Sequence, residues 1–156
     1  MKPVKGLRIH PAWQSHNLIT LQPMKLTPCE TSITKIDMTN FPKLVNAIID
    51  GIQEKKGRSI VVCDLTKFDT APAQYFVVCT GNTPQQVDAI ADSVEEFARK
   101  QAGEKPATVA GLNNAIWVAA DYGTVMVHIL VPDAREFYDI ENIWADANIT
   151  EIPDLD

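Results

Sequence analysis

Long apolar runs are missing from this sequence of 156 residues. The apolar runs that it does have, such as 59–63 and 125–131, are far shorter than the ~20 residues of a membrane-spanning helix. No charged start leads into an apolar stretch that ends in a small-residue cleavage site, as a secretory signal would. We therefore expect a soluble protein of the cytoplasm.

Cysteine is also scarce. The three cysteines, Cys29, Cys63 and Cys79, are odd in number and show no Cys-x-x-Cys spacing. Two of them lie in strand-like runs, where a thiol behaves as a small apolar group. The sequence therefore predicts neither a disulfide framework nor a zinc site.

The usual catalytic motifs are absent as well. The sequence has no glycine-rich phosphate loop, Gly-Lys-Ser/Thr, Gly-x-Ser-x-Gly, His-Glu-x-x-His or paired-aspartate metal motif. Gly81-Asn82-Thr83, at an expected strand-to-helix junction, could offer backbone N–H groups to an anion, but with one glycine and no nearby lysine a plain turn is favoured. His128, the only histidine after residue 37, has no partner at metal-ligand spacing. We expect no catalytic residue, cofactor or metal, and keep a cryptic nucleotidyltransferase-like enzyme or nucleotide-binding domain as the alternative.

Charge is distributed unevenly along the chain. Residues 1–37 carry a net charge of +3, whereas residues 38–156 carry −9. An acidic body is repelled by nucleic acid phosphates, so direct binding of RNA or DNA is not expected. Complementary fields raise encounter rates, which favours a basic protein as the partner.

The pattern of residues divides the chain into three parts. Residues 1–37 hold four prolines and no sustained apolar periodicity, which predicts a disordered or non-native leader. A functional arm or a targeting peptide remains the alternative for this leader. Residues 38–150 form the expected domain, and 151–156 are expected to be a frayed acidic tail.

Hydrophobic periodicity predicts a mixed α/β domain. Runs rich in β-branched residues indicate central strands covered on both faces, and apolar residues at helical spacing indicate helices on the sheet. Thr83 and Pro84 resemble a capped helix start, and Asp133 with Glu136 resembles a second capping box. The expected elements are a helix from Pro42 to Lys56, strands 59–64 and 75–80, a helix from Pro84 to Ala98, an extended piece at 107–110, a hairpin of 116–121 and 124–131, and a last helix from Asp133 to Ala147 whose Phe137, Ile140, Ile143, Trp144 and Ala147 face the core.

The hairpin is the one place where the sequence itself suggests a binding surface. If Tyr122 and Gly123 form a two-residue turn, Asp121 pairs with Thr124 and Trp117 with His128. One face is then wholly apolar, and the other carries a mixture of aromatic, polar and charged groups that suits an interface. A three-residue turn would instead bury Trp117, so its exposure stays open. The expected faces are Ile116, Val118, Ala120, Val125, Val127 and Ile129 toward the core, and Trp117, Ala119, Asp121, Thr124, Met126 and His128 on the other side.

Several ordered segments between about Leu44 and Asp146 resemble one known family. They are Ser59-Ile60-Val61-Val62-Cys63-Asp64-Leu65, Gln74-Tyr75-Phe76-Val77-Val78-Cys79-Thr80-Gly81, Gln86-Val87-x-x-Ile90-Ala91-Asp92, Trp117-x-x-x-Asp121-Tyr122-Gly123, Val127-His128 and Ala134-Arg135-Glu136-Phe137-Tyr138-Asp139-Ile140-Glu141 with Trp144. At this spacing they are similar to the ribosomal silencing factor family, also called Iojap-related. One departure is Gln74, where the family often has an aspartate whose role is therefore in question here.

The resemblance implies a nucleotidyltransferase-like fold without catalytic carboxylates and a factor that works by binding alone. Such a factor binds the fourteenth protein of the large ribosomal subunit on the intersubunit face, blocks joining of the small subunit and represses translation when nutrients are scarce. Whether the chain also forms a homodimer stays open. By analogy with the family, the partner-binding residues are Trp117, Asp121, Tyr122 and His128 of the hairpin, together with Arg135, Glu136 and Tyr138.

Overall fold

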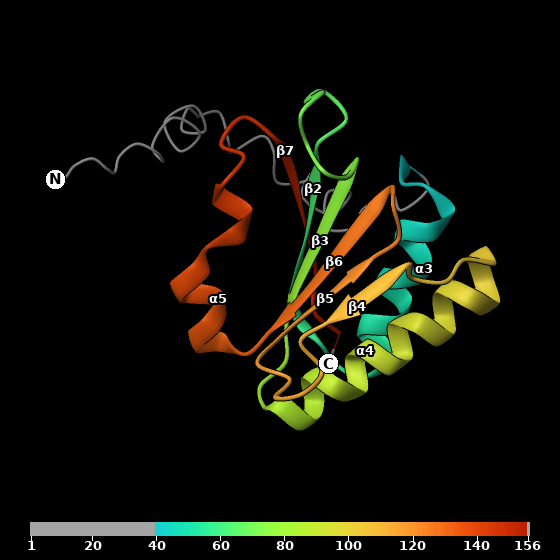
Figure 1. Ribbon diagram of the computed structural model, residues 1–156, viewed down its shortest axis with the longest axis vertical. Helices are drawn as coiled ribbons and strands as arrows, with labels where there is room; N and C mark the ends of the chain where they lie inside the picture. Colours follow the sequence, from blue (N-terminus) through green and yellow to red (C-terminus); the bar gives the residue numbers. More distant parts are fainter. Residues whose placement is uncertain (1–39, 156) are drawn as a thin grey trace, which may run out of the picture. The chain divides into compact units, whose positions relative to one another are not determined.

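The computed structural model describes residues 40–155, which form a six-stranded mixed sheet with helices packed on it (Figure 1). The strand order is β4-β5-β6-β3-β2-β7, and within the described residues only β3 and β6 pair in parallel. This confirms the predicted fold class. The elements are α3 (Lys43–Glu54), β2 (Arg58–Asp64), β3 (Tyr75–Thr80), α4 (Pro84–Phe97), the π-helix η3 (Ala98–Ala102), β4 (Thr108–Ala110), β5 (Trp117–Asp121), β6 (Val125–Leu130), α5 (Pro132–Tyr138), the 3₁₀ helix η4 (Ile140–Asn142) and β7 (Asn148–Ile152).

Helices α3 and α4 pack together on one face of the sheet, whereas α5 lies on the other side (Figure 1). Both long helices have the apolar periodicity expected of them, and the start of α4 is capped as predicted, because Thr83 Oγ1 accepts a hydrogen bond of 3.1 Å from the Gln86 N–H. No helix within 40–155 is long and apolar enough to cross a bilayer.

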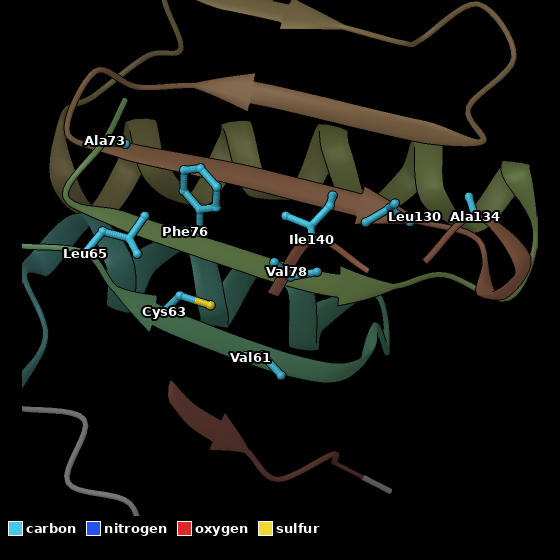
Figure 2. Packing of buried hydrophobic residues seen from close by; sticks show 9 residues of the cluster. All are labelled: Val61, Cys63, Leu65, Ala73, Phe76, Val78, Leu130, Ala134 and Ile140. Atoms are coloured by element: carbon cyan, nitrogen blue, oxygen red, sulfur yellow. The ribbon is translucent and has the colours of Figure 1, made fainter. Parts of the chain in front are cut away.

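The second face of the sheet is covered by a smaller core. Figure 2 shows Ala134 and Ile140, from the segment after β6, close to side chains of the inner strands. The cluster consists of Val61, Cys63, Leu65, Ala73, Phe76, Val78, Leu130, Ala134 and Ile140, with Trp117, Trp144 and Phe68 among the half-buried residues packed against it.

The hairpin of β5 and β6 has the predicted faces in a different register. Asp121 pairs with Met126 and Trp117 with Leu130, two positions from the expected pairing. The turn is displaced because Gly123, with φ +85°, occupies its first central position, where primed turns favour glycine. The Asp121 carboxylate accepts a hydrogen bond from the Gly123 N–H at 2.7 Å. A shift of two residues leaves the side chains of β5 and β6 on their predicted faces. The prediction for Ile116 was wrong: it precedes β5 and is 43% exposed instead of facing the core.

The prediction for the C-terminal part was wrong in three respects. The last helix starts at Pro132 without a side-chain cap and ends at Tyr138, because Asp139 takes the left-handed conformation with φ +48°. The chain then forms η4 and a sixth strand, β7, which pairs antiparallel with β2 and includes residues 151 and 152 of the expected frayed tail. Ile140 faces the core as expected, but Phe137 is 79% exposed and Ile143 is exposed too.

Gly51 allows the two long helices to approach closely. A Cβ atom at this position would lie 2.9 Å from the Val94 Cα, and the Ser93 hydroxyl donates a hydrogen bond of 2.8 Å to the Gly51 carbonyl. The contact is with backbone atoms, so a side chain at position 51 has no room unless the helices separate.

We predict that Gly51→Val lowers the free energy of unfolding by ~1–3 kcal/mol through overpacking of the α3–α4 contact. Asp50→Val, at the adjacent exposed position, is the matched control and should change stability by less than ~0.5 kcal/mol. Urea unfolding of both variants measures the difference. Equal stability of the two would show that the helix pair tolerates the side chain.

Candidate docking surface

Three of the predicted site residues meet on the α5 side of the sheet. Trp117 of β5 donates a hydrogen bond from its indole Nε1 to Nδ1 of His128 on β6, with 3.1 Å between the nitrogens. The Tyr138 ring of α5 lies 4.6 Å from the Trp117 ring, centroid to centroid. His128 packs in turn against Phe76 of β3, with the ring centroids 5.0 Å apart.

His128 supports Trp117 as a neutral, buried ring. It is 6% exposed, and burial lowers the pKa of the imidazole to about 4, although the Glu141 charge acts in the opposite direction. Because Nδ1 accepts the indole proton, the neutral ring carries its own proton on Nε2, which has no hydrogen-bond partner among residues 40–155. Those residues also contain no group of three His, Cys, Asp or Glu side chains that could hold a metal ion.

An aromatic surface extends from Trp117 toward solvent. Phe137 packs edge-on against Tyr138 with ring centroids 4.9 Å apart, and the two rings are 79% and 49% exposed. Trp117 is half-buried and lies against the Tyr138 ring. We call Trp117, Phe137 and Tyr138 the aromatic surface. Single exposed apolar residues need no explanation, but three contacting aromatic rings at the solvent boundary are typical of a binding site.

Acidic side chains dominate the chain around this surface. Between Pro132 and Ala147 the sequence holds five carboxylates and one basic residue, Arg135. Glu141 is paired with Arg135, whereas the other four carboxylates, Asp133, Glu136, Asp139 and Asp146, are exposed. The surface is therefore apolar at its centre and negatively charged around it.

Arg135 points into the domain. Its Nε and Nη2 donate to Glu141 Oε1 at 3.1 and 2.7 Å, and its Nη1 donates to the Ser59 carbonyl at 2.6 Å and to Thr80 Oγ1 at 2.8 Å. The guanidinium side chain is 14% exposed and that of Glu141 18%. Most of the donor capacity of Arg135 is thus used inside the chain.

The strand-to-helix turn considered for anion binding is internally satisfied. The Gly81 N–H donates to the Leu130 carbonyl at 2.9 Å, and the Asn82 N–H to Gln86 Oε1 at 2.7 Å. A Cβ atom at Gly81 would lie 2.9 Å from Val87 Cγ2, so the glycine serves the close packing of β3 against α4. This arrangement favours the plain turn over a phosphate cradle.

A family model described as "Ribosomal silencing factor during starvation" matches residues 38–156. The chain belongs to this family. The ribosomal silencing factor of Halalkalibacterium halodurans is 32% identical over 110 residues, which cover 70% of this chain and 92% of that protein. The chloroplastic protein Iojap of Zea mays is 30% identical over 80 residues, covering 51% and 34% of the two chains. A crystal structure of a Chromobacterium violaceum protein superposes with a TM-score of 0.61 at 34% identity, covering 65% of this chain and 83% of that one.

Family membership confirms the predicted resemblance and the predicted class of function. Ribosomal silencing factors are non-enzymatic proteins that silence translation in association with the ribosome. The candidate site of this silencing factor is therefore a surface that binds a partner, and not a catalytic centre.

The residues predicted for partner binding fall into three places in the silencing factor. Trp117, His128 and Tyr138 are in contact, and Arg135 and Glu136 adjoin them on α5. Asp121 shares the face of Trp117 but lies at the opposite end of β5, beside the hairpin turn. Tyr122 lies on the other face, where it lines a small cavity of about 40 Å³ beside α4.

The buried position of Tyr122 is reflected in its titration. Burial, together with the charge of Glu95, raises the pKa of the Tyr122 phenol to about 12, and its hydroxyl has no hydrogen-bond partner among the described residues.

Phe137, which the sequence pattern predicts to be in the core, is instead the most exposed ring of the aromatic surface. Its helical spacing from Ile140 and Trp144 indicated a core position, and no glycine or proline signalled that α5 ends after Tyr138.

We predict that His128 makes the silencing factor less stable as the pH falls from 6.5 toward 4. The unfolded imidazole takes up a proton near pH 6.5 and the folded one only near pH 4, so the unfolded state binds more protons within this window and the free energy of unfolding falls. The loss should reach up to about 3 kcal/mol across the window.

The comparison variant is His128→Asn, whose side-chain oxygen can still accept the Trp117 indole proton. Urea unfolding between pH 7 and pH 5 should show a shallower pH slope for the variant, while titration of other groups is common to both proteins. Identical slopes would mean that burial does not lower the pKa of His128, because a group with the same pKa in the folded and unfolded states adds nothing to the pH dependence of stability.

Proposed function

We propose that this silencing factor binds a basic ribosomal protein, the fourteenth protein of the large subunit, on the intersubunit face, and so prevents the small subunit from joining. The observation that carries this proposal is the aromatic surface of Trp117, Phe137 and Tyr138 with carboxylates around it. The identity of the partner and the position of its site are taken from the family resemblance. The geometry of the aromatic surface supports it as the part of the domain that would make the contact.

Apolar burial would supply the affinity. Aromatic residues that enter a pocket of a partner protein are the commonest hot spots, and removing one typically costs ~2 kcal/mol or more of binding free energy. Phe137 is suited to this role because 79% of it is still exposed in the free domain. Trp117, fixed by its bond to His128, provides a rigid base that loses little conformational entropy on binding.

Charge would select the class of partner. Asp133, Glu136, Asp139 and Asp146 repel the phosphates of ribosomal RNA and attract a patch of lysine and arginine. A basic protein therefore fits this surface better than RNA does.

The bulk of the bound domain would block joining. A domain of about 115 residues has a radius of gyration of about 13 Å. Atoms of the two subunits are in contact only when they come within ~4 Å of each other. A folded domain of this size on the intersubunit face therefore excludes the small subunit without any catalytic step.

We predict that Phe137→Ala weakens binding to purified large subunits by ~2 kcal/mol and leaves the melting temperature almost unchanged, because an exposed ring contributes little to the core. Leu112→Ala is the control: Leu112 is also a large exposed apolar residue, but it lies beside α4. Fluorescence anisotropy of the labelled protein titrated with large subunits gives both affinities.

A subunit-joining assay with the wild type and Phe137→Ala tests the mechanism. Wild-type protein added to mixed subunits should leave separate large and small subunits on a sucrose gradient, and Phe137→Ala should permit joining. If the wild type neither sediments with the large subunit nor reduces joined ribosomes, the proposed function is wrong.

We also predict that Glu136→Lys slows association with the large subunit at low salt, since exposed charges at the edge of an interface act mainly by steering. The difference from wild type should shrink as ionic strength rises and the Debye length falls to ~8 Å at 0.15 M. Asp92→Lys makes the same charge change on the exposed face of α4 and should have a much smaller effect. Stopped-flow association rates at several salt concentrations test this, and equal slowing by both variants would point to net charge alone.

A further inference from the structure

The side chain of Arg135 joins four elements of the domain. It belongs to α5, forms a forked ion pair with Glu141 of η4, and donates to β2 at Ser59 and to β3 at Thr80. The ion pair therefore spans the left-handed residue Asp139, where the chain changes direction between α5 and η4.

The acceptor on β2 has an unusual backbone that suits this contact. Ser59 and Ile60 lie in a bulge opposite the single residue Cys79, because the register shifts between Arg58 and Val61. Ser59 has a φ of +52°, its carbonyl accepts from Arg135, and its N–H donates to Asp154 Oδ1 at 2.7 Å. Both polar backbone groups of this residue thus bond to side chains from the C-terminal part of the chain, and strained non-glycine residues persist where such contacts hold them.

Besides the bonds of Arg135, α5 is held by the buried Ala134 and by the contact of Tyr138 with Trp117. The helix has seven residues, and within α5 and η4 only Ala134 and Ile140 are buried. Helices this short are not stable on their own and depend on tertiary contacts. Phe137 and Tyr138 come two and three positions after Arg135, so the direction in which they point depends on how Arg135 is held.

We propose that Arg135 is a positioning residue for docking: its bonds to Glu141, Ser59 and Thr80 hold α5 so that Phe137 and Tyr138 are presented over Trp117 in the geometry that the partner binds. Because its effect is measured as binding to the large ribosomal subunit, this proposal rests on the proposed function. A lysine would not replace the arginine, because a single ammonium group cannot reproduce the planar fork toward Glu141 while also reaching two acceptors on the sheet.

The first test compares Arg135→Gln and Arg135→Lys with Arg99→Gln, which changes an exposed arginine on η3 on the far side of the sheet. Affinity for purified large subunits is measured at a temperature at which unfolding curves show all proteins folded. Both Arg135 variants should bind about tenfold more weakly, a coupling of the usual size between contacting residues, and Arg99→Gln should bind as the wild type does. Wild-type affinity for the folded Arg135 variants would overturn the proposal.

A double-mutant cycle separates positioning from direct contact. If Arg135 acts through Phe137, Arg135→Gln should cost much less affinity in a Phe137→Ala background than in the wild type. The same fold loss in both backgrounds would mean that Arg135 touches the partner itself and would overturn the positioning role.

Hydrogen exchange of the isolated protein tests the positioning without a ribosome. Arg135→Gln should speed amide exchange in α5 and leave α3 unchanged, and unchanged protection of α5 would contradict the proposal. Glu141→Gln, which removes one charge of the pair, provides the same measurement if the arginine variants do not fold. If the wild type fails to bind large subunits while α5 still loses protection, the proposed function is wrong and the internal role of Arg135 stands.

Discussion

The parallel pairing of β3 with β6 is the constraint on which the rest of the domain depends. Parallel neighbours cannot be joined by a tight turn, so the chain between them must cross over the sheet. Here the crossover begins with α4, which covers one face and packs against α3 through the narrow contact at Gly51. The other face is left to the segment after β6, and this segment begins with a helix of only seven residues.

This unequal covering explains why the candidate docking surface lies on the α5 side of the sheet. The α3–α4 side is closed by long apolar helices, and even the polar Tyr122 is buried there. On the opposite side the short α5 leaves Phe137 and Tyr138 at the solvent boundary while Trp117 is held from below by His128. A buried neutral histidine is a costly support, because its second nitrogen has no partner among the described residues, but it fixes the indole before any partner arrives.

Local sequence patterns predicted the elements in which apolar residues recur with a single period, either that of a helix or that of a strand. α3, α4, β2 and β3 have consistent apolar spacing, and α4 also has a capping threonine. Strands β5 and β6 keep their predicted faces because a shift of two residues does not change the alternation of side chains. The end of α5 was not predictable in this way: Asp139 adopts φ +48° without a glycine, and the bonds that favour this reversal come from residues distant in sequence. β7 was missed because Ile149 and Ile152 are few and stand among polar residues.

The candidate site shows the same division between local and distant causes. The family resemblance includes Trp117, His128 and Tyr138 among seven expected partner-binding residues, but their mutual contacts appear only in the structure. The inward direction of Arg135 depends on the bulge at Ser59, which no short sequence motif indicates. Phe137 was misplaced because periodicity alone cannot distinguish a core ring from one that the chain reversal turns outward.

An acidic surface with an aromatic centre has a further consequence for specificity on the ribosome. Residues 38–156 carry a net charge of −9, so most of the phosphate-rich surface of a ribosome repels the domain. The potential becomes favourable only where basic protein side chains outweigh the RNA, and close contact there is retained only if an apolar pocket accepts the aromatic rings. Discrimination in the proposed function would therefore come largely from repulsion at wrong sites, while affinity would come from a few rigid rings at the right one.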